Sequence, residues 1–492
     1  MNITIFQFFH WYFPVDGNLW NHASEQAQRL TDLGITHVWL PPAYKSASGT
    51  DEPGYAVYDL YDLGEFDQKG TVRTRYGTRE EYLGCIKAIH ERKMGVLADI
   101  VLNHKLGGDE EEDVPVQQVK KDNRLEKISD QTTLQAYTRF TFPGRSGKYS
   151  DYIWNWHSFS GVSKGDEIYI ILSEHTNGEW ENVMERQNGN YDYLMGCDIE
   201  YRNPAVREEL KKWGKWYVEA TGIDGFRLDA VKHIATDFFP EWVPFLKDSF
   251  QRDFLCIGEY WKADTDALLS YIDATAGMIQ LFDVPLHFNF HKASKEGKGF
   301  DLRTIFDNTL VKARPELAIT FVDNHDTQPL QSLESWVEAW FKPHAYAIIL
   351  LREQGIPSVF YPALYGADYS DTKDGQQLEI HILPTGELET LIKIRSAYAY
   401  GDQYDYLDTP DIIGWTRTGR DDQPDSGCAV LLTHAEGGEK WMCMGERNAG
   451  KTLVNALGDA SHEITLNEKG DGLFKVEPGK VSVWILKDTN KS

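Results

Sequence analysis

The feature that most constrains this chain is a series of short apolar runs that alternate with longer helical patterns. The runs are rich in β-branched and aromatic residues and lack the polar alternation of strands with one face in water, which is typical of parallel strands covered by helices. The candidate strands are 3–9, 37–40, 96–102, 225–228, 254–257, 278–282, 318–322 and 358–361. Eight strand–helix units in sequence predict an α/β chain built on a closed (β/α)8 barrel, the TIM barrel.

Local signals mark the ends of these elements. Helical patterns are expected near 21–33 and 79–93. Gly34 follows the first and is expected to end it, because glycine readily takes the left-handed conformation after a last turn. Pro41 and Pro42 stop the second strand, since proline cannot donate to a sheet.

Two regions interrupt the alternation of strands and helices. The third and fourth strands are separated by about 120 residues, far more than a helical crossover needs. That interval is polar, rich in Gly, Asp, Tyr and Trp, and lacks helical periodicity. After Tyr400, short runs such as 412–415, 428–432 and 481–486 are separated by Gly/Asp-rich turns, as in a β-sandwich. The expected domains are a barrel over 1–104 and 204–397, an inserted β-rich subdomain over 105–203 after strand three, and a C-terminal all-β sandwich over 398–492.

Charge and hydropathy limit the partners. The formal net charge of −26 argues against nucleic acid and anionic membranes, which need a basic face. No apolar run reaches the eighteen or so residues of a membrane span. The opening MNITIFQFFHWYF lacks a basic region and a cleavage site, and the five cysteines are scattered without CxxC pairs. We expect a monomer in the cytoplasm, or a secreted protein if a signal peptide has been removed.

Chemistry in such barrels lies at the carboxyl ends of the strands. Asp229 follows strand four and Glu259 follows strand five. Neighbouring strands are ~4.8 Å apart, so the two carboxyl groups are expected ~5 Å apart, the separation of a retaining glycosidase. Arg227 lies on the same side of its strand as Asp229 and would keep it ionised as a nucleophile, whereas Glu259 must hold a proton. Asp326, after strand seven, would stabilise positive charge in the transition state.

Each residue has an ordinary structural interpretation when taken alone. An isolated aspartate at a strand end is usually a turn residue or a helix cap, and a lone histidine is usually an ordinary hydrogen-bonded group. Turns alone would rarely place acids, amides and histidines together after four separate strands. The set as a whole therefore predicts a site.

At these residues the sequence resembles the α-amylase family of glycoside hydrolases. Its four conserved blocks are similar to DIVLNH (99–104), GFRLDAVKH (225–233), GEYW (258–261) and FVDNHD (321–326). Segments 54–77, 188–196 and 340–361 look like the bacterial liquefying-type members, with the intracellular ones nearest in appearance.

The resemblance implies endo-hydrolysis of α-1,4-glucosidic bonds in starch, glycogen or maltodextrins, with retention. It assigns Asp229 as nucleophile, Glu259 as acid/base and Asp326 as transition-state stabiliser. The substrate-binding residues that it implies are Tyr55, His104, Leu194, Arg227, Lys232, His233, Trp261 and His325.

The resemblance also implies a structural calcium between barrel and insert. Its ligands would be Asn103, Asp192, Asp198 and the main-chain carbonyl of His233, since calcium collects oxygen ligands from distant segments. The secreted relatives hold further metals with aspartates, where this chain has Ser160, Glu181, Glu200 and Arg202. A fixed cation at Arg202 disfavours a second calcium beside it, so one calcium is predicted there.

Other functions stay open. A transglycosylase, a branching enzyme, an exo-acting glucosidase or a maltooligosaccharide-forming amylase would keep the same carboxylates. A non-catalytic carbohydrate-binding relative would be expected to lack one of them. A metal hydrolase finds no HxH or HExxH pattern, and the histidines are better used as hydrogen-bond donors to sugar hydroxyls.

Overall fold

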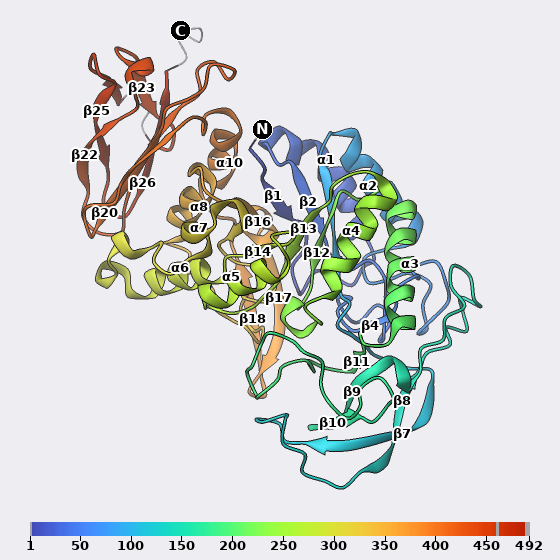
Figure 1. Cartoon of the computed structure of the whole chain (residues 1–492). Coiled ribbons are helices and arrows are strands. Elements are labelled where there is room, and N and C mark those ends of the chain that lie inside the picture. Colours follow the sequence, from blue (N-terminus) through green and yellow to red (C-terminus); the bar gives the residue numbers. More distant parts are fainter. Residues whose placement is uncertain (1, 459–461, 488–492) are drawn as a thin grey trace.

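The computed structural model describes residues 2–458 and 462–487 and contains the predicted barrel (Figure 1). Eight strands close in the order β1-β16-β15-β14-β13-β12-β5-β2, and each neighbouring pair is parallel. The strands are β1 (Ile5–Gln7), β2 (His37–Leu40), β5 (Gly95–Ile100), β12 (Gly225–Leu228), β13 (Leu255–Gly258), β14 (Gln280–Phe282), β15 (Ala318–Phe321) and β16 (Ile356–Phe360). All eight coincide with the predicted runs, with no end shifted by more than two residues.

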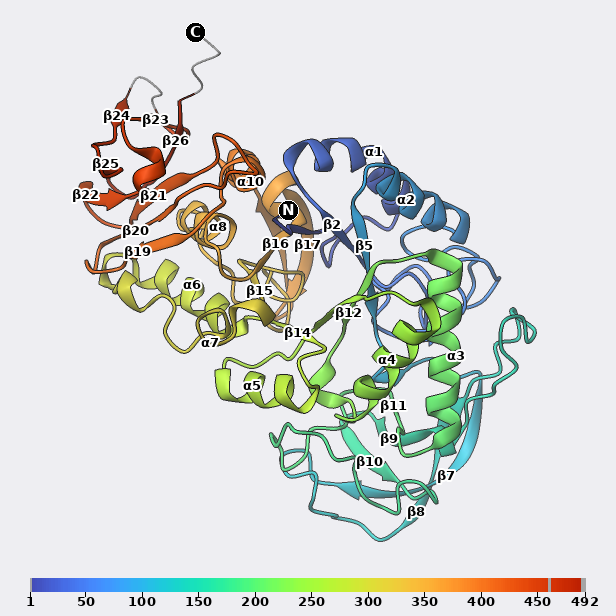
Figure 2. The same cartoon turned by 45° about the horizontal axis from the view of Figure 1, so that its top comes forward.

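Helices cover the barrel on the outside, as Figures 1 and 2 show from two directions. They are α1 (Leu19–Leu33), α2 (Arg79–Glu91), α3 (Pro204–Thr221), α4 (Phe238–Phe250), α5 (Thr265–Ala274), α6 (Val284–Glu296), α7 (Leu310–Ala313), α8 (Lys342–Leu351), α9 (Tyr361–Tyr365) and α10 (Leu388–Ala397). Gly34 ends α1 in the left-handed conformation with φ 103°, as expected. Thr78 and Glu81 form a reciprocal capping box at the start of α2.

The interval after β5 forms a β-rich insert, which lies beyond the carboxyl end of the barrel (Figure 1). Its strands are β6 (His104–Lys105), β7 (Glu110–Val119), β8 (Thr132–Arg139), β9 (Phe159–Lys164), β10 (Glu167–Ile171) and β11 (Cys197–Ile199), in the sheet order β6-β11-β9-β10-β7-β8. Two short strands, β3 (Lys45–Ser46) and β4 (Val57–Asp59), precede it. A buried ion pair between Arg145 and Asp59, at 2.8 Å, ties the insert to this part of the barrel.

A second excursion, which the sequence analysis did not predict, follows β16. Strands β17 (Ala367–Lys373) and β18 (Gln376–Ile382) form an antiparallel hairpin whose side chains are mostly exposed. Tyr369 stacks on Tyr12 with ring centroids 4.2 Å apart, and Asp371 accepts a hydrogen bond from the Tyr12 hydroxyl at 2.7 Å. The hairpin is thereby attached to the loop that follows β1.

The C-terminal part is the predicted all-β domain (Figure 2). Its sheets have the orders β19-β20-β21-β26-β23-β24 and β22-β25. The strands are β19 (Gln403–Tyr406), β20 (Ile412–Arg417), β21 (Cys428–Thr433), β22 (Gly438–Cys443), β23 (Thr452–Asn455), β24 (Glu463–Thr465), β25 (Asp471–Val476) and β26 (Val481–Leu486). A separate apolar core, which includes Leu431, Phe474 and Trp484, fills the space between the sheets. The domain boundaries given above stay a prediction.

None of the described helices is long and apolar enough to cross a membrane.

Candidate active site

Asp229 and Glu259, the two carboxylates expected to act together, follow paired residues of adjacent barrel strands. Strands β12 and β13 pair Arg227 with Ile257 and Leu228 with Gly258. Asp229 and Glu259 are the next residues on each strand. Their backbone amides continue the ladder, since Asp229 donates to the Ile100 carbonyl and Glu259 to the Leu228 carbonyl, both at 2.9 Å.

The guanidinium of Arg227 hydrogen-bonds to both carboxylates. Its Nη1 donates to Asp229 Oδ1 at 2.6 Å, and its Nη2 donates to Glu259 Oε2 at 2.9 Å. Glu259 Oε2 also accepts the backbone amide of Ala230 at 3.1 Å. Ala230 has φ 49°, a left-handed conformation that is uncommon outside glycine and that turns the chain sharply after Asp229. The arrangement fixes the direction of both carboxyl groups.

Burial sets the proton affinities of the site. It raises the pKa of Asp229 to about 6, although the Arg227 guanidinium opposes the shift. Burial also raises the pKa of Glu259. The Arg227 guanidinium opposes this shift, and the negative charge of Asp229 increases it. Burial raises the pKa of Asp326 well above its ordinary value, and the neighbouring carboxylates add to this. For Glu259 this raised pKa favours the protonated form, which a general acid needs.

Asp99 is one residue of this site to which the sequence analysis assigned no role. It is fully buried on β5, and its Oδ1 accepts Arg227 Nη1 at 2.9 Å. Its Oδ2 accepts the Tyr55 hydroxyl at 2.8 Å and the Trp39 indole N–H at 3.0 Å. The signal was present, because an aspartate inside an apolar strand needs a buried partner.

Aromatic rings form one wall beside the carboxylates. Tyr55 lies nearly parallel to His325, with centroids 5.2 Å apart and planes at 13°. Trp11 is nearly parallel to both rings, with centroids 5.6 Å from Tyr55 and 6.2 Å from His325. His325 Nε2 faces Asp326 Oδ2 at 3.4 Å. Tyr55, His325 and Asp326 are thus brought together as predicted site residues.

The other predicted histidines use their protons within the protein. His104 Nε2 donates to the Tyr55 carbonyl at 2.9 Å, and His233 Nδ1 donates to the Tyr191 carbonyl at 2.6 Å. Burial lowers the pKa of His104 to about 4 and that of His233 to about 3, so each ring is neutral and carries one proton. In this arrangement the second ring nitrogen of each is an acceptor, and the contact of these two histidines with sugar stays a prediction.

The remaining predicted substrate residues lie at the edge of the site. Lys232 Nζ donates to the Trp261 carbonyl at 3.0 Å. The Trp261 ring packs on His287, with centroids 5.9 Å apart, so part of it serves core packing. Leu194 is half-buried in the loop before β11, and its contact with substrate stays a prediction.

The insert contributes two further residues that the sequence analysis did not single out. The Tyr191 carbonyl orients His233, and its ring lies 5.3 Å from Lys232 Nζ. Glu185, almost completely buried, contacts Lys262 Nζ at 3.0 Å. Both residues lie in a long polar loop without helical or strand periodicity, so the sequence did not indicate these contacts.

The predicted calcium ligands fit a cation in their chemistry. Asn103 Oδ1 is buried without a hydrogen-bond partner, as a free ligand oxygen would be. Its Nδ2 donates to Asp198 Oδ1 at 3.2 Å. Burial raises the pKa of Asp192 to about 7 and that of Asp198 well above its ordinary value, a desolvation cost that a cation would offset. Among the described residues, no three His, Cys, Asp or Glu side chains form a metal-binding group, so the amide and carbonyl oxygens are needed.

The positions that differ from the secreted relatives make hydrogen bonds within the protein. Arg202 binds Glu200 through two nitrogens, at 2.7 and 2.6 Å. Glu181 Oε1 accepts the backbone amide of Arg202 at 3.1 Å. Ser160 donates to Asp198 Oδ2 at 2.5 Å. A guanidinium thus neutralises one carboxylate beside the predicted calcium site.

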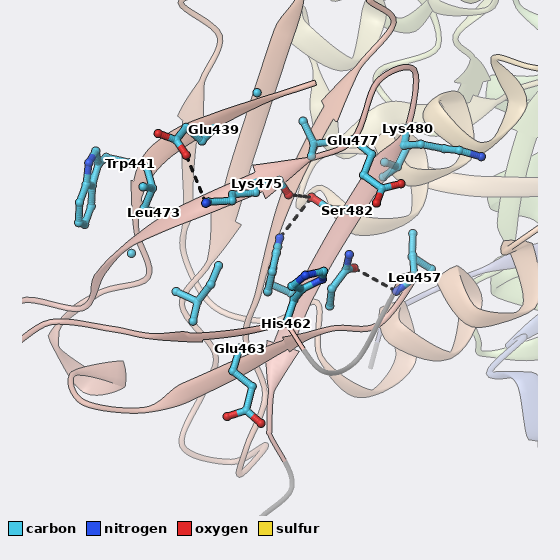
Figure 3. A pocket seen from close by; sticks show the side chains of 18 of the residues that line it. Glu439, Trp441, Leu457, His462, Glu463, Leu473, Lys475, Glu477, Lys480 and Ser482 are labelled. Carbon is cyan, nitrogen blue, oxygen red and sulfur yellow. Dashed lines mark hydrogen bonds and ion pairs between the residues drawn. The ribbon is translucent and has the colours of Figure 1, made fainter. Parts of the chain in front are cut away.

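A groove of about 1140 Å³ lies far from this rim, in the C-terminal domain (Figure 3). Its sides include Trp441 and Leu473 at one end and His462 and Leu457 at the other. No predicted site residue lines it.

Comparisons with known proteins show the family of this chain. The chain matches the family described as Alpha amylase, catalytic domain, over residues 19–379. It is 48% identical to an α-amylase of Geobacillus stearothermophilus, over 100% of this chain and 88% of the relative. It is 45% identical to the cytoplasmic α-amylase of Escherichia coli K12, over 99% of both chains. The fold matches the α-amylase of Geobacillus thermoleovorans complexed with acarbose, with a TM-score of 0.67 at 19% identity, over 99% of this chain and 98% of the other. The chain belongs to the α-amylase family of glycoside hydrolases.

Proposed function

We propose that this chain hydrolyses internal α-1,4-glucosidic bonds of starch, glycogen or maltodextrins with retention at the anomeric carbon. The observation that carries the proposal is the single guanidinium of Arg227 that holds Asp229 and Glu259 at equivalent positions of adjacent strands. A retaining glycosidase needs such a pair, one carboxyl ionised and one protonated.

The reaction proceeds in two displacements. Asp229 attacks the anomeric carbon while Glu259 donates its proton to the departing glycosidic oxygen, which breaks the bond and leaves a glycosyl ester. Glu259, now ionised, removes a proton from water as that water attacks the same carbon, and Asp229 leaves as a carboxylate. Asp326 stabilises the positive charge that develops on the sugar ring in both steps.

The walls of the site hold the sugar for this chemistry. Tyr55 would stack on its face, His325 would donate to hydroxyls, and Lys232 and Trp261 would line the leaving-group side. His104 and His233 are held as acceptors at the rim by their own hydrogen bonds.

Calcium is part of the proposal. It would be held by Asn103, Asp192, Asp198 and the His233 carbonyl, and would tie the insert to the floor of the cleft. We also propose a cytoplasmic monomer. Support comes from the E. coli relative named cytoplasmic and from the five free cysteines, which suit a reducing compartment.

The test is a product-resolved assay on soluble starch and maltoheptaose that follows the anomer released. Rapid loss of polymer length with α-configured maltooligosaccharides is expected. Asp229→Asn should lower turnover by several orders of magnitude, because it removes the nucleophile and keeps the shape. Asp166→Asn, at the exposed β9–β10 turn, is the control and should be unchanged.

Other outcomes distinguish the alternatives. Chain-extended products would point to a transglycosylase, and products of one fixed length from the first minutes to an exo-acting enzyme. No turnover by the wild-type protein would favour a carbohydrate-binding relative, and substantial activity of Asp229→Asn would contradict the assigned nucleophile.

A further inference from the structure

Gln7 is a buried polar residue at the end of β1 that has no role in the proposed mechanism. Its side chain is 1% exposed, and its Nε2 lies 3.0 Å from His325 Nδ1. With the amide in this orientation its nitrogen donates, and the ring nitrogen that faces it presents its lone pair.

His325 cannot readily escape this contact. Its ring is buried among Phe9, Trp11, Trp39 and Tyr55, with centroid distances between 5.1 and 6.2 Å. A ring flip would have to displace four aromatic neighbours in a close-packed interior. The hydrogen bond to Gln7, rather than free rotation, therefore selects which nitrogen carries the proton.

We propose that Gln7 is a positioning residue that fixes His325 as the Nε2–H tautomer, so that the ring directs its one N–H toward Asp326 and the sugar. The inference rests on the proposed role of Asp326 and deepens it. Of the three predicted histidines, His104 and His233 donate their proton to carbonyls. His325 is the member of this set whose proton is left for the reacting centre.

The tautomer matters because of the charge around it. Asp326 shares the cleft with Asp99, Asp229 and Glu259, against the single guanidinium of Arg227. With the proton on Nε2, His325 presents a positive edge to Asp326 Oδ2 at 3.4 Å. With the proton on Nδ1, it would present a lone pair to a carboxylate, and the transition-state stabiliser would lose its donor.

The first test reads the tautomer without substrate, by ¹⁵N NMR of histidine-labelled protein, with His325→Phe to assign the signal. Wild type should show the proton on Nε2. Gln7→Glu, nearly the same shape and measured at a pH at which the new carboxyl group is ionised, replaces the donor by a carboxylate that can only accept and should move the proton to Nδ1. Gln28→Glu, the same change on the exposed face of α1, should leave the signal unmoved. An Nδ1–H tautomer in the wild type, or no change in Gln7→Glu, would overturn the proposal.

The second test is kinetic. Gln7→Met should lower kcat on starch by about 10- to 100-fold, the range expected for a hydrogen bond that acts on a charged group. The same substitution in a His325→Phe background should lower kcat less than about 2-fold, since additivity fails for residues that act through one another. Equal losses in both backgrounds would mean a merely structural role.

If Gln7→Met does not fold, Gln7→Glu takes its place in the same comparison. Because the NMR result needs no activity, it stands even if Asp229 proves not to be the nucleophile.

Discussion

Glu185, in the insert, forms an ion pair with Lys262, three residues after Glu259, at 3.0 Å. The carboxylate side chain is 3% exposed and the lysine side chain 38%. This ion pair therefore connects the inserted segment to the strand end that carries Glu259. The carboxylate of the pair is buried, and the ammonium group is partly exposed to water.

This asymmetry predicts unequal effects of the two neutralising substitutions. Lys262→Met should lower the free energy of unfolding by about 2–4 kcal/mol, because it leaves a buried carboxylate unpaired. Glu185→Gln should cost only about 1 kcal/mol, because the lysine can reach water. Urea unfolding of both variants checks this. Lys247→Met, which breaks the exposed pair with Asp253, is the control and should change stability by less than about 0.5 kcal/mol. Equal costs for Glu185→Gln and Lys262→Met would contradict the asymmetry.

Asp99 should affect catalysis through Arg227. Asp99→Asn removes one carboxylate from the Arg227 guanidinium, and the amide that replaces it cannot fully satisfy the hydrogen bonds of that group. We therefore expect kcat to fall about 10- to 100-fold with little change in KM. The control is Asp224→Asn, just before β12 at the opposite end of the barrel, where the carboxylate accepts from Val96 N at 2.8 Å. That change should lower the melting temperature and leave kcat within a factor of two. A wild-type kcat in Asp99→Asn would show that Asp99 is not needed to orient Arg227.

Glu259→Gln should separate protonation from nucleophilic attack. The amide cannot donate a proton to the glycosidic oxygen, so turnover on starch should fall by about 10²- to 10⁴-fold. Maltosides with strongly acidic phenol leaving groups need little protonation, and glycosylation should be partly rescued on them. The measurement is kcat/KM on both substrate types, and equal losses would contradict the acid role.

The pH profile should reflect the same two carboxyl groups. Burial raises the pKa of Asp229 to about 6, and the nucleophile must be ionised, so kcat/KM should fall as the pH drops through about 6. Glu259 must be protonated, so activity should also fall at higher pH as it ionises. In Glu259→Gln, measured on an activated substrate, the alkaline fall should disappear while the acid fall remains. An acid limb that begins only below about pH 4 would mean that Asp229 is not shifted.

Calcium removal should lower stability and then activity. Calcium at about 100 times its Kd would add about 2.7 kcal/mol to the free energy of unfolding if only the folded state binds it. Excess chelator should therefore lower the melting temperature, and added calcium should restore it. Asn103→Ala should lose most of this calcium response, and Asp166→Asn should retain it. A melting temperature that is the same with calcium and with chelator would contradict the proposed site.

Much of the barrel was predictable because its signal is local. Each of the eight strands is a short apolar run, and parallel strands buried on both faces leave that pattern regardless of what they contact. The positions of Asp229 and Glu259 followed from the rule that barrel strands end at one rim. The hairpin β17–β18 was not predicted, although Leu378, Ile380 and Ile382 alternate with polar residues in β18; none of the hairpin residues is buried, so it adds nothing to the core.

The parts of the site that were missed depend on contacts between distant segments. Gln7 reads as an ordinary polar residue in a strand until barrel closure places it against His325, 318 residues away. The proton assignments of His104 and His233 depend on the carbonyls of Tyr55 and Tyr191, and side-chain type does not indicate a backbone partner. Asp99 could have been found, because a carboxylate within the apolar run 96–102 is hard to bury alone.

Closure of the barrel by β1 against β16, where Ile5 pairs with Ser358, also has a consequence for synthesis on the ribosome. The amino-terminal strand emerges first, yet one of its two neighbours is made only after most of the chain. Until then, β1 has one free edge, and edges of this kind pair readily with other chains. A nascent chain is therefore exposed to misassembly for most of its translation, and hydrolytic activity can appear only once the last strand has been released.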